Sequence, residues 1–157
     1  MSFSRRDFLR PFTKQDREAP LRPPYLLDSS LLESECIKCG GACATICPEG
    51  IIKILNDGTP SIEFKSRGCT FCDKCAKACN YGVLGAEGDK KIEGICSIDI
   101  TKCISWNKSI CFSCKDACYY KAIDFLGMFR PSINQNCVNC GFCIDKCPSV
   151  AISIKGV

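Results

Sequence analysis

The sequence predicts an α+β fold in which short strands and short helices form two similar halves in tandem. Three observations lead to this prediction. Seventeen of the 157 residues are cysteine, far above the content of an ordinary globular domain. The cysteines gather in four clusters of similar spacing. A short, alternating apolar segment follows the first and the last of these clusters, as expected for a strand.

The composition excludes several classes of protein. The chain has no histidine, which rules out zinc fingers built from Cys and His, histidine acid–base catalysis and Ser–His or Cys–His nucleophiles. The formal charge of +4 treats every cysteine as neutral, whereas four clusters ligated by thiolates would shift it to about −4. We therefore expect no nucleic-acid partner. No stretch approaches the length of a membrane span, so none is expected.

The cysteines themselves are expected to bind metal rather than to form disulfides. Their number is odd, and disulfides require an oxidising compartment that is usually reached through a secretory signal. The first 25 residues contain four prolines and many charges but no apolar run of the length of a signal peptide. A cytoplasmic protein with free or metal-bound thiolates is therefore expected. Soft thiolates select zinc, copper(I) or iron–sulfur clusters.

Each cysteine cluster contains four cysteines, and we call the clusters motifs one to four. Motifs two and four follow the spacing C-x₂-C-x₂-C-x₃-C, motif one has one extra glycine before its third cysteine, and motif three has seven residues between its first two cysteines. Their members are Cys36, Cys39, Cys43 and Cys47 in motif one; Cys69, Cys72, Cys75 and Cys79 in motif two; Cys103, Cys111, Cys114 and Cys118 in motif three; and Cys137, Cys140, Cys143 and Cys147 in motif four.

This spacing is typical of ligands of [4Fe–4S] clusters. Three closely spaced cysteines curl over one cubane, and in bacterial ferredoxins the fourth cysteine ligates the other cluster of the pair. The expected fold is thus two tandem bacterial-type ferredoxin units, each of the 2×[4Fe–4S] type. Three or four clusters are expected, because the seven-residue gap in motif three leaves undecided whether that motif binds a cluster. Zinc held by four cysteines is the alternative, but zinc ribbons separate their cysteine pairs widely.

Crossed ligation is inferred within each pair of motifs. The first three cysteines of motif one would share a cluster with Cys79, those of motif two with Cys47, those of motif three with Cys147, and those of motif four with Cys118. Ligation by each motif alone would use the same sixteen cysteines and stays open. Cys96 has no partner motif and is expected to be a non-ligating, buried thiol.

The repeat extends beyond cysteine. An apolar pair follows the last cysteine of each motif by four and five residues. The alternating segments 52–55 and 61–64 flank the turn signal Asn56-Asp57-Gly58 and predict a hairpin between motifs one and two. A short helix is expected to carry the third and fourth cysteines of each motif on one face. The predicted domains are a basic N-terminal arm (1–30), a first ferredoxin pair (31–88) and a second pair (89–157).

The four motifs, together with Ser4-Arg5-Arg6 and Arg22-Pro23-Pro24-Tyr25, resemble the NapF family. These are ferredoxin-type accessory proteins of the periplasmic nitrate reductase system. The gapped third motif and the ending Cys147-Pro148-Ser149-Val150-Ala151-Ile152 carry much of this resemblance, while the extra glycine of motif one departs from the family pattern. The resemblance implies a cytoplasmic protein that helps to mature the molybdenum-containing catalytic subunit before its export.

The segment Ser4-Arg5-Arg6-Asp7-Phe8-Leu9 looks like a twin-arginine export motif. Without an apolar stretch behind it, export is not expected. Two interpretations remain, a solvated basic arm and a docking arm that binds an acidic partner through Arg5, Arg6 and Arg10.

Two functions are therefore weighed. The chain is expected either to be an accessory factor for a protein client or to be a general low-potential electron-transfer ferredoxin, since one fold serves both roles. It has no glycine-rich nucleotide fingerprint or P-loop, so no enzyme activity of its own is expected.

Overall fold

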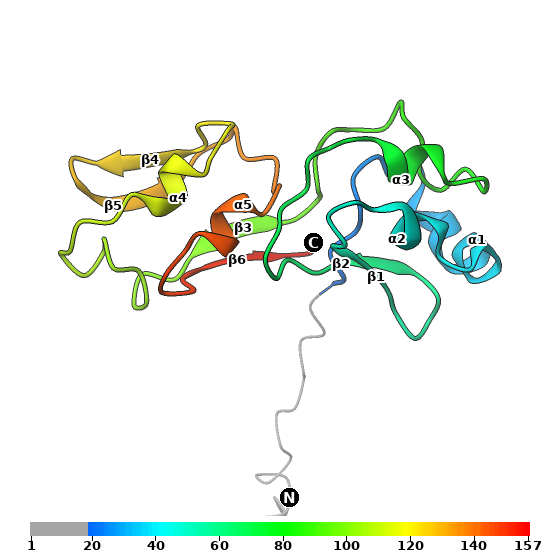
Figure 1. Cartoon of the computed structure of the whole chain (residues 1–157), viewed down its shortest axis with the longest axis horizontal. Coiled ribbons are helices and arrows are strands. Elements are labelled where there is room, and N and C mark those ends of the chain that lie inside the picture. Colours follow the sequence, from blue (N-terminus) through cyan, green and yellow to red (C-terminus); the bar gives the residue numbers. More distant parts are fainter. Residues whose placement is uncertain (1–18) are drawn as a thin grey trace, which may run out of the picture.

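The computed structural model describes residues 19–157, so the Ser4–Leu9 motif and Arg10 lie outside the described part of the chain. The described chain forms two lobes that lie side by side (Figure 1). The first lobe contains η2 (Ser29–Leu31), α1 (Leu32–Cys39), α2 (Ala42–Ile46), β1 (Ile52–Ile54), β2 (Pro60–Ile62) and α3 (Lys74–Lys77). The second contains β3 (Ile95–Ile98), α4 (Ser113–Asp116), β4 (Ile123–Leu126), β5 (Phe129–Ile133), α5 (Phe142–Asp145) and β6 (Ile152–Lys155).

One β-hairpin joins the two motifs of each lobe. In the first lobe β1 pairs with β2 in antiparallel fashion, with Ile52 opposite Ile62. In the turn, Gly58 has a φ of 80°, and the Asp57 carboxylate accepts hydrogen bonds from the Thr59 N–H and hydroxyl groups at 2.9 and 2.7 Å. The hairpin predicted from Asn56-Asp57-Gly58 is confirmed. The second lobe repeats it with β4 and β5, where Ile123 lies opposite Ile133.

A second pairing joins the beginning of each lobe to its end. In the second lobe β3 pairs with β6, so that Cys96 lies opposite Ile154 and Ile98 opposite Ile152. In the first lobe the match is shorter, with Leu26 bridged to Leu84 and the Leu27 N–H donating to Val83 O at 3.0 Å. Within residues 19–30, which the sequence assigned to the basic arm, Leu26 and Leu27 therefore pack on the first lobe, whereas Ala19 is bridged to Gly156 at the end of the second.

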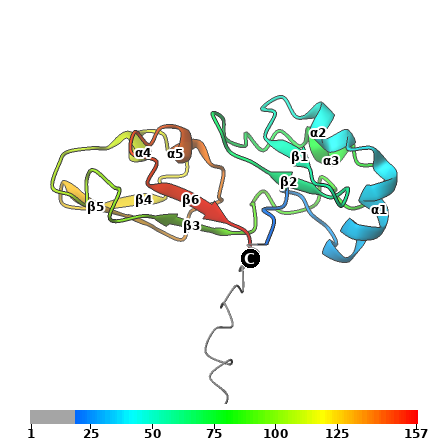
Figure 2. The ribbon, with the colours of Figure 1, turned by 90° about the horizontal axis from the view of Figure 1, so that it is seen from below.

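The helices that follow the cysteine loops are only about one turn long. Helices α2, α3, α4 and α5 contain the third cysteine of each motif and end before the fourth. The prediction that one helix face carries both cysteines is therefore wrong. The reason is that the chain leaves the helix after the third cysteine, so that the fourth points elsewhere. In Figure 2 these helices lie on the same side of the strands in both lobes.

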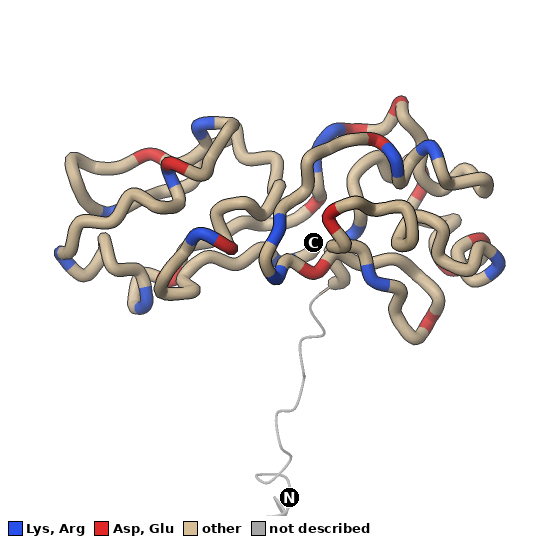
Figure 3. Tube along the Cα trace, in the orientation of Figure 1, with Lys and Arg blue, Asp and Glu red and all other residues tan. Residues whose placement is uncertain are grey.

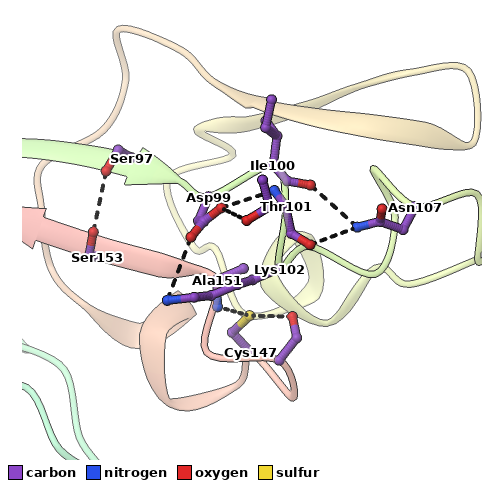
Figure 4. A network of polar contacts seen from close by, with 10 residues as sticks. Ser97, Asp99, Ile100, Thr101, Lys102, Asn107, Cys147, Ala151 and Ser153 are labelled. Carbon is purple, nitrogen blue, oxygen red and sulfur yellow. Dashed lines mark hydrogen bonds and ion pairs between the residues drawn. The ribbon is translucent and has the colours of Figure 1, made fainter.

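The seven-residue insertion of motif three, residues 104–110, folds as a series of turns against the second lobe. The indole N–H of Trp106 donates to Pro131 O at 3.1 Å, and Ser105 is buried. The Asn107 amide donates to the carbonyl oxygens of Ile100 and Thr101 (Figure 4), and also to that of Cys103. These bonds satisfy the backbone of a turn and hold the insertion beside Cys103.

The two lobes meet through the backbone of motifs two and four. The Cys69 N–H donates to Cys140 O at 2.6 Å. Near this contact Ile92, which is 0% exposed, donates its N–H to Val138 O, and the Asn139 amide donates to Ile92 O and Gly94 O. Lys and Arg residues are interspersed with Asp and Glu along both lobes (Figure 3).

The core lies between the strands and the cysteine loops. The apolar pairs predicted after each motif are all buried, at 5% exposure or less. These pairs are Ile51–Ile52, Val83–Leu84, Ala122–Ile123 and Ala151–Ile152. Within residues 19–157 no helix has the length and apolar character needed to span a membrane.

Candidate cluster-binding sites

The sixteen cysteines of the four motifs line four cavities, and each cavity receives its thiols from two motifs. The first three cavities open onto about 370 Å³ of free space each and the fourth onto about 320 Å³. The first is lined by Cys36, Cys39, Cys43 and Cys79, and the second by Cys47, Cys69, Cys72 and Cys75. The third is lined by Cys118, Cys137, Cys140 and Cys143, and the fourth by Cys103, Cys111, Cys114 and Cys147.

This grouping is the crossed one inferred from the sequence. In every motif the first three cysteines face one cavity and the fourth reaches the cavity of the partner motif. The short helices explain the crossing, because a chain that ends its helix after the third cysteine carries the fourth across to the neighbouring motif. Motif three takes part despite its insertion, since Cys103 lines the fourth cavity together with Cys111.

The extra glycine of motif one is accommodated by two consecutive residues with positive φ. Gly40 (62°) ends α1 and Gly41 (81°) begins α2. Cys43 is buried and faces the first cavity, as it would without the insertion. Helix α1, which carries Cys36 and Cys39, was not foreseen. The signal that could have indicated it is Asp28, whose carboxylate accepts from the Ser30 N–H at 2.8 Å and caps the turn η2 that leads into α1.

Backbone N–H groups point at the sulfur atoms of three fourth cysteines. The donors belong to the buried apolar pairs, so each of these pairs also positions a hydrogen bond. The bonds run from Leu84 N–H to Cys79 Sγ at 3.4 Å, from Ala122 N–H to Cys118 Sγ at 3.2 Å and from Ala151 N–H to Cys147 Sγ at 3.2 Å. Such bonds stabilise a thiolate. Burial acts to raise the pKa of Cys147, yet the hydrogen bonds from Ala151 and Ser149 leave it below its ordinary value.

Elsewhere burial keeps the free thiols protonated. It raises the pKa of Cys69 to about 12 and the pKa values of Cys43, Cys75 and Cys114 to about 11. A thiol in such surroundings ionises only where positive charge compensates it, as iron does when it is ligated. Binding a metal cluster at these positions therefore releases protons.

The sequence suggested that Cys96 stands apart from the four motifs, but in the structure it does not. It is half-buried on β3 and lines the third cavity together with Cys137 and Cys143, with which it interacts. This interaction with Cys96 holds the pKa values of Cys137 and Cys143 below their ordinary values. The position of Cys96 follows from the pairing of β3 with the distant strand β6, and the spacing of the cysteines does not predict that pairing.

The four cavities follow one another through the molecule. Cys43 of the first cavity interacts electrostatically with Cys75 of the second, and Cys114 of the fourth does so with Cys143 of the third. Between the lobes the Cys69–Cys140 backbone hydrogen bond joins the second cavity to the third. Beside it the rings of Phe71 and Tyr120, one from each cavity, meet edge to face at 6.3 Å.

The donor set of each cavity fits a [4Fe–4S] cluster. A cubane needs four thiolates, an apolar surround and N–H donors toward sulfur. Four motif cysteines line each cavity, with Ile, Val, Leu or Ala side chains beside them, and the third cavity has Cys96 in addition. Within residues 19–157, no three or more Cys, Asp or Glu side chains are arranged to hold a single metal ion.

Comparison with known proteins agrees with this geometry. A family model described as a 4Fe-4S dicluster domain matches residues 35–83, and one described as a 4Fe-4S binding domain matches residues 132–153. The fold is thus of the 4Fe–4S ferredoxin type.

Several curated proteins are similar over most of the chain. The ferredoxin-type protein NapF of Escherichia coli K12 is 32% identical over 140 residues, covering 86% of this chain and 84% of that protein. NapF of Haemophilus influenzae is 31% identical, covering 86% and 78% respectively. The ferredoxin-type protein NapG of the same organism is 27% identical, over 87% of this chain and 58% of that protein. The chain therefore belongs to the NapF family of ferredoxin-type proteins.

Proposed function

We propose that the chain binds four [4Fe–4S] clusters, one in each cavity, through the sixteen cysteines of its motifs. The observation that carries this proposal is that all four cavities have the same crossed set of four thiols, including the one built around the insertion of motif three. When bound, the clusters supply one-electron redox chemistry. The chain's own part is to provide the thiolates, to donate N–H groups to sulfur and to exclude water.

We further propose that the protein is a cytoplasmic accessory factor without catalytic activity of its own. Its client would be the molybdenum-containing catalytic subunit of periplasmic nitrate reductase, which it binds before export and whose [4Fe–4S] cluster it helps to assemble. Membership of the NapF family supports this assignment. The basic residues Arg5, Arg6 and Arg10, outside the described residues, would dock the client.

The cluster content is tested by anaerobic purification and assays of iron and acid-labile sulfide. Four clusters give about sixteen irons and as many sulfides per chain, with S = 1/2 EPR signals after reduction by dithionite. About twelve irons would leave one cavity without a cluster, and single Cys-to-Ala variants would identify it. Zinc without sulfide would refute the cluster proposal.

The accessory role is tested by co-purification with the client. The protein should retain the catalytic subunit that still carries its export signal and should not retain the exported form. A variant in which Arg5, Arg6 and Arg10 are replaced by Ala should bind the client less tightly while keeping its full iron content. Equal binding of the exported and unexported forms would count against maturation.

Electron transfer is the second candidate, and the contact between the lobes favours it. The second and third cavities adjoin across the Cys69–Cys140 hydrogen bond, so four clusters would form a continuous series. A carrier should be reduced and reoxidised repeatedly with no loss of iron, and should react with several redox partners. An accessory protein that delivers clusters should instead lose iron to a cluster-free client.

A further inference from the structure

The third cavity differs from the other three because five cysteines line it instead of four. The fifth, Cys96, reaches it from the middle of β3, where it lies opposite Ile154 of β6. Its side chain shares this cavity with Cys137 and Cys143, the two cysteines with which it interacts most strongly. A half-buried thiol that lines the same cavity as the predicted iron ligands is placed to approach the same iron.

The equivalent place in the first lobe is occupied by a residue that cannot ligate. Leu84 and Ile152 both lie five residues after a fourth cysteine, and their strand partners are Leu26 and Ile98. Two residues before those partners stand Pro24 and Cys96. Pro24 lines the second cavity as Cys96 lines the third. The two cavities are thus equivalent, and the fifth thiol is an addition to the second lobe alone.

We propose that Cys96 is an exchange ligand of the cluster in the third cavity, able to replace Cys137 on its iron. In the exchange an Fe–Sγ bond to Cys96 forms while the Fe–Sγ bond to Cys137 breaks, and the proton of the Cys96 thiol passes to the released Cys137 thiolate. Iron and sulfide keep their oxidation states, so no oxidant or reductant is needed. Cys137 is the residue replaced because it lies in a loop, whereas Cys143 is held in α5.

Exchange gives this cluster a property that the others lack. Replacing one thiolate by another keeps four ligands on the cluster at every stage. Once Cys96 has replaced Cys137, motif four supplies two of these ligands instead of three, so the attachment of the cluster to motif four is weaker. The proposal rests on cluster binding by the third cavity, and it deepens the accessory function by naming the cluster that is most easily released or rebuilt.

Three cysteine variants test the exchange through iron content. Cys96→Ala should keep all clusters, and Cys137→Ala should also keep them, with altered EPR g values for one cluster. The double variant should lose about four irons. The matched control is Cys69→Ala, the equivalent of Cys137→Ala in the lobe with Pro24, which should lose its cluster. Loss of iron from Cys137→Ala to the same extent as from Cys69→Ala would overturn the proposal.

A labelling experiment on the unsubstituted protein tests the same point without relying on a variant that must fold. The cluster-loaded protein is alkylated anaerobically, and the modified cysteines are mapped by mass spectrometry. Exchange predicts that label divides between Cys96 and Cys137, whereas label confined to Cys96 would refute it. The iron content of the unsubstituted protein separates the two hypotheses, because about sixteen irons with label on Cys96 alone leaves cluster binding intact and removes only the exchange.

Discussion

The second and third cavities, one in each lobe, have the same backbone shape but are supported by different side chains. Phe71 and Asn139 are equivalent residues two positions after the first cysteine of their motifs, and both have positive φ, at 51° and 58°. In the first lobe the buried Tyr25 hydroxyl donates to the carbonyl of Phe71 at 2.7 Å. In the second lobe the Asn139 side chain donates to the backbone of the segment between the lobes.

This difference shows which parts of the lobe the cavities require. The hairpin, the one-turn helix, the buried apolar pair and the crossed fourth cysteine occur in both lobes. Two features occur in one lobe only: α1 with the two glycines that follow it, and the insertion 104–110. Neither feature changes how the cysteines group. The cavities are therefore specified by the repeated elements, and each lobe secures them with its own contacts.

The largest expected effect comes from pairs of cysteine replacements that test the crossing. Cys36→Ala with Cys79→Ala removes two ligands of one cavity, so the protein should keep about twelve irons. Cys69→Ala with Cys79→Ala touches two cavities and should leave about eight. In the second lobe, Cys111→Ala with Cys147→Ala corresponds to the first pair. Ligation within single motifs predicts the reverse order, and iron analysis decides between them.

The next largest effect is expected where the two lobes meet. Ile92→Ala removes a fully buried side chain between them and should lower the free energy of unfolding by about 2–4 kcal/mol. The control is Ile95→Ala, three residues away and 62% exposed, for which the loss should be below about 0.5 kcal/mol. Anaerobic urea unfolding measures both. Equal midpoints for the two variants would show that the contact between the lobes does not stabilise the protein.

A smaller effect is expected at the glycines of motif one. Gly40→Ala places a methyl group in open space and costs about 1 kcal/mol through its left-handed backbone. Gly41→Ala adds a contact of 2.7 Å with Ile54 Cγ1, which should cost about 1 kcal/mol more. Thermal unfolding of the two variants measures this difference. A Gly40→Ala protein that is less stable than Gly41→Ala would contradict the steric explanation.

The smallest effect is expected at the hydroxyl group that supports the second cavity. Tyr25→Phe removes the hydrogen bond to Phe71 and should cost about 1 kcal/mol, while Tyr119→Phe, at an 87% exposed residue, should cost nothing measurable.

This hydroxyl also makes stability depend on pH. Burial, followed by the nearby Asp73 carboxylate and Cys69 thiol, raises the pKa of Tyr25 to about 12, against about 10 in the unfolded chain. Its contribution is complete below pH 10 and is lost as the pH rises toward 12. Tyr25→Phe should therefore flatten the decline in stability between these pH values. An unchanged slope would show that another group causes the decline.

The features that the sequence predicted correctly are local ones. The turn Asn56-Asp57-Gly58, the cysteine spacings and the apolar pairs each lie within a few residues, where turn chemistry and periodicity decide the structure. The grouping of the cysteines in the cavities agrees with the crossed ligation inferred from the spacing, although the spacing left ligation within single motifs open. Those regularities located sixteen of the seventeen cysteines that line the cavities, all but Cys96.

The features that the sequence did not reveal depend on contacts between distant segments. The pairing of β3 with β6 and the bridge between Leu26 and Leu84 join residues more than 50 positions apart. These pairings place Cys96 in the third cavity and Tyr25 under the second. The ends of the helices were missed for a different reason, since spacing places two cysteines four residues apart but does not say where the helix stops.

The crossing of the fourth cysteines has a consequence for how such a chain can grow or shrink. No single motif completes a cavity, because each motif supplies three cysteines to one cavity and its fourth cysteine to another. The smallest segment that can be duplicated or deleted with its cavities complete is therefore a pair of motifs, and such a change alters the number of cavities by two. Loss of motif three alone would leave Cys147 without its partners and the third cavity without Cys118.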